Sequence, residues 1–135
     1  MRQIQLLLIA VVSILFACGP GDHSQTAVTL DNGLKWTANP ETTTGIQNML
    51  KLTDAFSATA DADAYSKLKT GLENEFQLIF KNCTMKGEAH NQLHNYLLPM
   101  KDMFGGLASS KQESRQESFR KLQAHLSAYA DYFES

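Results

Sequence analysis

The sequence has few of the features that would support a membrane-spanning or catalytic interpretation. A permanent transmembrane helix needs roughly twenty consecutive apolar residues, and the longest apolar run, Ile4 to Phe16, has only about thirteen. The sequence also has no Gly-x-Ser-x-Gly motif, no phosphate-binding glycine loop and no His-Glu-x-x-His helix. In the last of these motifs a glutamate acts as the base, whereas Asn91 follows His90 here. We therefore expect a protein that is not an enzyme.

Basic residues and cysteines are scarce as well. The chain has 12 Lys and Arg against 14 Asp and Glu, with a net charge of −2, so nothing attracts a nucleic acid and no nucleic-acid partner is expected. Of the two cysteines, Cys18 and Cys83, the first has a separate role proposed below. Cys83 is then the only thiol, which excludes an intramolecular disulfide and leaves it buried, metal-bound or paired with another chain.

The N-terminus has the order of a bacterial lipoprotein signal. Arg2 precedes the apolar run, and Leu15-Phe16-Ala17-Cys18 resembles the lipobox, in which a small residue precedes a cysteine that becomes acylated. We expect residues 1–17 to be a cleaved signal peptide and Cys18 to carry lipid, with 18–26 as a flexible tether and 27–135 as the folded domain. Ordinary signal cleavage that leaves a free Cys18 is the alternative. The expected location is the cell envelope, at the outer membrane or the periplasmic face.

The sequence of the expected folded domain predicts an all-α protein with a short β-hairpin at its N-terminus. Between Thr26 and Thr37 apolar and polar residues alternate around Asp31-Asn32-Gly33, which is a strong hairpin turn signal. Four amphipathic stretches follow. They are expected near 43–59, from Asp61 or Asp63 to about 82, from after Gly87 to Gly105-Gly106 with a kink at Pro99, and from about 110 to 133.

Short connections make successive amphipathic helices antiparallel. The predicted architecture is therefore an up-down-up-down four-helix bundle preceded by the N-terminal β-hairpin. This fold by itself indicates no function.

One segment has the composition of a metal site. Cys83, Met85, His90 and His94 lie within twelve residues, at the junction between the second and third predicted helices. His90 and His94 are one helical turn apart, so both imidazoles can bind one ion. Gly87 allows the reversal that would bring the two sulfur atoms over the first turn of the next helix. We therefore predict a four-ligand site at this corner.

The ligand set favours copper or zinc. Thiolate and thioether suit copper(I), thiolate with imidazole suits zinc, and two histidines, a cysteine and a distant methionine form blue-copper centres. His125, in the fourth predicted helix, is a possible extra ligand. Such a protein would store, deliver or sense the metal while its lipid holds it at a membrane.

Two other interpretations remain open. Free cysteine often packs as a small apolar residue, so the corner residues could be core of a structural or interaction lipoprotein that binds an envelope protein and no metal. A haem held between methionine and histidine is the third hypothesis. The absence of Cys-x-x-Cys-His excludes covalent haem attachment.

The segment Cys-Thr-Met-x-Gly-x-x-His-x-x-x-His from Cys83 to His94 resembles a motif of a family of small uncharacterised Bacteroidota lipoproteins. Leu34-Lys35-Trp36 and the ending Tyr132-Phe133-Glu134 extend the resemblance over the mature domain. The resemblance implies a helical, exported protein and a shared site. It implies no particular reaction.

Overall fold

A computed structural model describes residues 27–135 of the chain. The predicted signal peptide at 1–17, the lipid attachment point Cys18 and the tether at 18–26 lie outside the described residues. Within 27–135, none of the helices combines the length and the apolar character that a membrane crossing requires.

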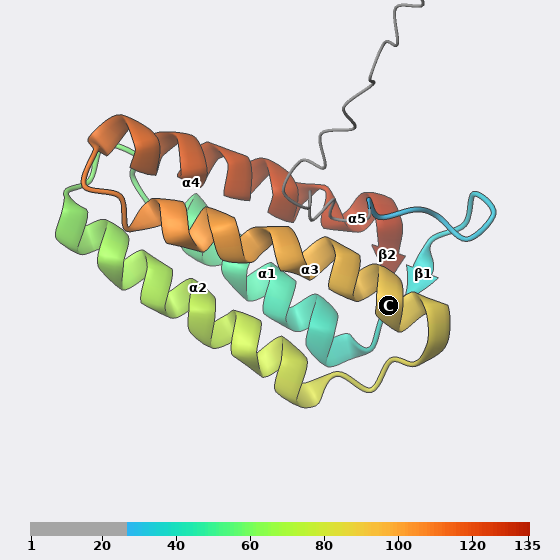
Figure 1. The fold of residues 1–135 in the computed structure, drawn as a ribbon. Helices are drawn as coiled ribbons and strands as arrows, with labels where there is room; N and C mark the ends of the chain where they lie inside the picture. Colours follow the sequence, from blue (N-terminus) through green and yellow to red (C-terminus); the bar gives the residue numbers. More distant parts are fainter. Residues whose placement is uncertain (1–26) are drawn as a thin grey trace, which may run out of the picture.

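The described chain is mostly helical, as predicted. Its elements are β1 (Trp36–Thr37), α1 (Pro40–Asp54), α2 (Ala62–Asn82), α3 (Gly87–Leu107), α4 (Gln112–Ser127), α5 (Tyr129–Tyr132) and β2 (Phe133–Glu134). The four long helices lie side by side, and each runs opposite to the one before it (Figure 1). α1 packs on α2 and α4, and α3 packs on α4 and α2.

Local sequence explains where the first two helices begin. Pro40 is the first residue of α1, where a missing N–H costs no hydrogen bond and the fixed φ already suits a helix. Asp61 is the N-cap of α2 and accepts a hydrogen bond from the Ala64 N–H at 2.9 Å. The predicted cap of α2 is confirmed, whereas α1 begins and ends earlier than the predicted 43–59.

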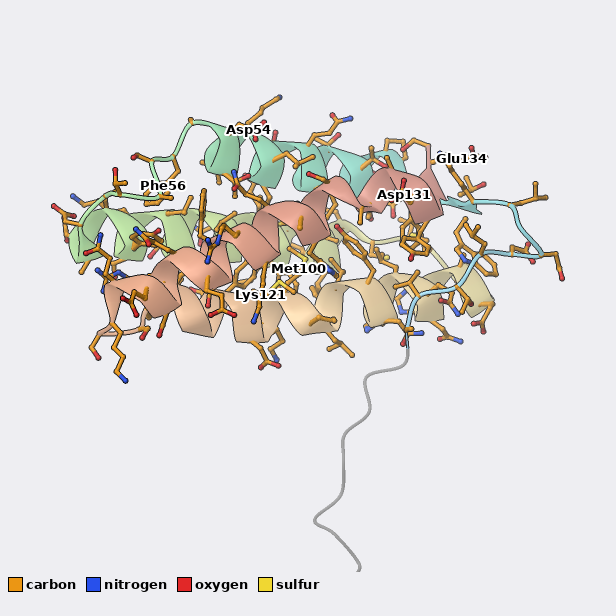
Figure 2. All side chains as sticks on the ribbon, turned by 90° about the horizontal axis from the view of Figure 1, so that it is seen from above. Asp54, Phe56, Met100, Lys121, Asp131 and Glu134 are labelled. Atoms are coloured by element: carbon orange, nitrogen blue, oxygen red, sulfur yellow. The ribbon has the colours of Figure 1, made fainter. Side chains whose placement is uncertain are left out.

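The core lies along the common axis of the helices. Met49, Leu72, Met100 and Leu122 come from four different helices, and each has no more than a trace of exposed surface. In Figure 2 Met100 lies near the middle of the molecule, with side chains filling the space between the ribbons. This burial follows the three-and-four spacing of apolar residues that predicted the helices.

The predicted N-terminal hairpin is only partly correct. The turn forms, because Asp31 and Leu34 exchange two backbone hydrogen bonds of 2.9 Å around Asn32 and Gly33, both of which have positive φ. The extended segment beyond it does not pair back on residues 28–30. Instead β1 pairs in parallel with β2, with Trp36 opposite Phe133, so the small sheet joins the two ends of the described chain (Figure 1).

The later helices also differ from the prediction in detail. α3 begins at Gly87 itself, continues through Pro99 and ends at Leu107, beyond the glycine pair that was expected to stop it. The fourth predicted helix is interrupted at Ala128, where α4 ends and the short α5 begins. The interruption turns the last residues toward β1, so that they form β2 instead of another helical turn.

Candidate functional site

The candidate site is the turn between α2 and α3. Cys83 follows the last residue of α2 in extended conformation, and α3 begins four residues later at Gly87, whose φ is +63°. Only glycine adopts this conformation routinely, and no neighbouring atom lies within 4 Å of where its Cβ would be. Gly87 therefore serves the backbone reversal and not a close packing contact.

The reversal brings Cys83 against the first turn of α3. The Cys83 Sγ lies 3.6 Å from the Nδ1 of His90, and both residues are half-buried. This distance is short enough for a hydrogen bond involving sulfur. Two of the four predicted ligands are therefore in contact with each other.

His94 is the neighbour of His90 on the same face of α3. The two ring centroids are 4.4 Å apart, with 57° between the ring planes. His94 also lies edge-on to Phe80 of α2, at a centroid distance of 5.4 Å. Burial lowers the pKa of His94, and the nearby His90 lowers it further. His94 is therefore held more firmly in the neutral form, which is the form that binds metals.

Met85 is the fourth predicted ligand. It is half-buried and packs against the hydrophobic core. The structure thus places Cys83 against His90 and His90 beside His94, while Met85 lies in the same turn with its side chain on the core.

Cys83, His90 and His94 do not form a metal site in the arrangement that the structure shows. Across residues 27–135, no group of three or more His, Cys, Asp and Glu side chains has the arrangement needed to hold a metal ion. What is present is one close sulfur to nitrogen contact and a second imidazole beside it. A site formed by all three residues would require a side-chain arrangement that differs from this one.

His125 belongs to a different arrangement. Its Nε2 is 2.7 Å from the backbone oxygen of Tyr96, while the Tyr96 hydroxyl donates to the backbone oxygen of His125 at 2.9 Å. The two rings stack at a centroid distance of 4.4 Å. At 3.6 residues per turn Tyr96 lies about 200° around α3 from His94. His125 is therefore on the other face of α3 and is not a ligand of the corner.

The reciprocal pair of Tyr96 and His125 is the feature that sequence reasoning missed. Burial lowers the pKa of His125, although its hydrogen bond to the Tyr96 carbonyl acts in the opposite direction. The pair lines a cavity of about 290 Å³ together with Pro99 and Tyr132. The only signal in the sequence was Pro99, which removes one backbone donor from α3 and marks an irregular site in that helix.

The comparisons with known proteins assign neither a family nor a function to this chain. No family model, no curated protein and no solved structure matches the sequence or the fold significantly.

Proposed function

We propose that this chain is a non-catalytic lipoprotein of the cell envelope, anchored through Cys18, whose up-down-up-down four-helix bundle binds copper(I) or zinc. The ligands are Cys83, His90 and His94, with Met85 as a thioether donor. The observation that carries the proposal is the 3.6 Å separation between the Cys83 sulfur and the His90 ring nitrogen across the turn between α2 and α3.

That separation has the value expected for two ligands of one ion. Zinc lies about 2.3 Å from a thiolate sulfur and about 2.0 Å from an imidazole nitrogen, and tetrahedral angles then place sulfur and nitrogen about 3.5 Å apart. A metal ion would therefore fit between the two atoms with little change in their distance. Two adjustments remain, because the side chain of His94, which lies beside His90, and that of Met85, which packs against the core, must both turn toward the ion.

The donor atoms of these ligands favour zinc or copper(I). One thiolate and two imidazoles are a common zinc set, and a thioether in addition favours copper(I). A corner that is half-buried lets an ion enter and leave, as storage, delivery or sensing requires. Copper(I) and zinc are therefore distinguished by whether Met85 contributes to affinity.

The test is an anaerobic titration of the mature chain with copper(I) and with zinc. We expect one ion per chain, and we expect Cys83→Ser or His90→Gln to weaken binding by at least about 100-fold, because removing even an outer partner of a metal ligand costs about 10- to 100-fold. His125→Gln is the matched control, since it removes a histidine from the other face of α3. Met85→Leu lowers affinity for copper(I) and not for zinc.

The metal proposal is refuted if the unsubstituted chain binds neither copper(I) nor zinc. It is also refuted if Cys83→Ser weakens metal binding no more than His125→Gln does. The second candidate then applies, namely a structural or interaction lipoprotein. Two observations favour it: His94 packs edge-on to Phe80, and Cys83 and Met85 both pack against the core. In that case the same substitutions lower the stability of the chain, and added metal does not raise the unfolding midpoint.

A further inference from the structure

The tight turn at Asp31–Leu34 displays apolar side chains to solvent. Leu34 has 70% of its surface exposed and Leu30 has 40%. Leu34 is the most exposed large apolar residue in the described part of the chain. Single exposed leucines are ordinary, but these two flank the same two-residue turn.

The loop that carries the two leucines is held rigidly. Two backbone hydrogen bonds of 2.9 Å close the turn itself. Behind it, the Trp36 Nε1 donates to the Thr29 backbone oxygen at 2.6 Å, and the Thr29 N–H donates to Gln92 of α3 at 2.9 Å. The leucines therefore stay exposed because the backbone is fixed, and inserting them into an apolar phase would cost little conformational entropy.

The position of the loop in the chain, close to the proposed lipid anchor, favours a membrane as its binding partner. The turn begins four residues after Ala27, the first described residue, and Cys18 lies nine residues before Ala27. Nine residues span at most about 30 Å when fully extended. A lipid on Cys18 would therefore hold Ala27 within about 30 Å of the bilayer surface and the turn, four residues further along, within about 45 Å. Among the described residues, Leu30 and Leu34 are the exposed large apolar side chains nearest to this anchor along the chain.

We propose that the turn from Leu30 to Leu34 inserts its leucines into the outer part of a lipid bilayer and so orients the bundle on the membrane. The inference rests on the proposed lipid anchor at Cys18. The turn carries one acidic residue, Asp31, and Lys35 follows it, so its charges balance. Docking is consequently driven by apolar burial and does not depend on anionic lipid or on salt.

Trp36 is the reporter for the test, because it is the only tryptophan of the sequence and lies two residues from Leu34. The mature chain is coupled chemically at its N-terminus to a synthetic diacyl lipid and mixed with phosphatidylcholine vesicles. A fraction of the phosphatidylcholine is brominated near the headgroup end of its acyl chains. We expect bromine to quench Trp36 emission, equally at low and high salt.

The control is a leucine of similar exposure elsewhere on the surface. Leu98 of α3 is 44% exposed. Leu34→Ser is expected to lower the docked-to-free ratio about tenfold, the effect of losing most of one leucine's burial, while Leu98→Ser leaves the quenching unchanged. Circular dichroism of both variants confirms that the helices are intact.

Absence of quenching in the unsubstituted chain overturns the docking proposal and leaves the turn to a protein partner. Equal loss of quenching in Leu34→Ser and Leu98→Ser also overturns it. The synthetic lipid makes this result independent of natural acylation. Whether Cys18 is acylated is decided separately, by the mass of the N-terminal peptide from cells that produce the full chain.

Discussion

Gly45 and Gly105 provide a matched test of how closely α1 and α2 pack. Both glycines lie inside helices, where alanine is favoured over glycine by about 1 kcal/mol. Gly105 is exposed, and no atom lies within 4 Å of where its Cβ would be. Gly45 is buried against Ile79 of α2, and a Cβ there would overlap Ile79 Cγ1 and lie 2.9 Å from Cδ1.

The structure predicts opposite signs for the same substitution. Gly105→Ala should raise the free energy of unfolding by up to about 1 kcal/mol. At Gly45 the gain in helix propensity is opposed by overpacking, which costs about 1–3 kcal/mol in a well-packed core. Cγ1 is attached directly to the Cβ of Ile79, so it cannot move far from its position. Ile79 is also only 1% exposed, so its side chain has little room to turn away. We expect Gly45→Ala to lower the free energy of unfolding by about 1–2 kcal/mol.

Urea denaturation followed by circular dichroism measures both variants. In a domain of this size a loss of 1 kcal/mol also lowers the thermal midpoint by about 4–8 °C. Combining Gly45→Ala with Ile79→Ala should remove the overlap, so the double variant should be more stable than the sum of the two single effects predicts. A Gly45→Ala variant that is as stabilised as Gly105→Ala would refute the close approach of α1 and α2.

Three further predictions concern the end of the bundle that contains β1 and β2. Tyr96→Phe should lower the free energy of unfolding by about 1–2 kcal/mol in urea denaturation, because the buried backbone oxygen of His125 loses its hydroxyl donor. Since burial lowers the pKa of folded His125, its full contribution to stability is present above the unfolded pKa of about 6.5 and is lost as the pH falls toward the folded pKa. His125→Gln should therefore reduce the stability difference between pH 7 and pH 5, and an unchanged difference would exclude this role. Deletion of residues 133–135 removes β2, and it should red-shift Trp36 emission and expose residues 27–37 to proteolysis, whereas resistance equal to that of the full chain would contradict the pairing.

Periodicity predicted the helices because burial of one face is a local property of the sequence. Tyr65, Leu68, Leu72 and Ile79 of α2, for example, are three, four and seven residues apart, which places them on one face of the helix, and all four are buried. The cap at Asp61 was predictable for the same reason, since cap and helix are neighbours in sequence. Tertiary packing decides the exact helix ends, such as the break between α4 and α5 at Ala128. The periodicity of apolar residues carries no information about tertiary packing.

The pairing of β1 with β2 could not be predicted from local pattern. Alternation around Asp31-Asn32-Gly33 predicts a turn correctly, but it does not say which strand will pair with Trp36 and Thr37. The partner is the C-terminal segment at Phe133 and Glu134, and the sequence pattern assigned Phe133 to the end of a helix. A parallel pair between residues so distant in sequence depends on where four helices have placed both ends.

The candidate site was predictable to a similar depth. Spacing fixed His90 and His94 on one face of a helix, because residues four apart are neighbours there. The contact of Cys83 with His90 follows from the turn geometry at Gly87, which the sequence permitted without specifying a distance. The partner of His125 was hidden because the reciprocal hydrogen bonds with Tyr96 join two helices through backbone oxygens, which leave no trace in residue type.

The first turns of α3 connect the two proposals physically. No side chain caps this helix at Lys86, so its start depends on tertiary contacts. Gln92 lies about 200° around the helix from both His90 and His94, accepts a hydrogen bond from the Thr29 N–H of the loop and donates one to Glu88. The same two helical turns thus face the proposed metal corner on one side and hold the apolar turn on the other. Because the loop is already fixed by its own hydrogen bonds, an ion bound to His90 and His94 adds no order that docking needs, and we expect metal binding and membrane docking to be independent of each other.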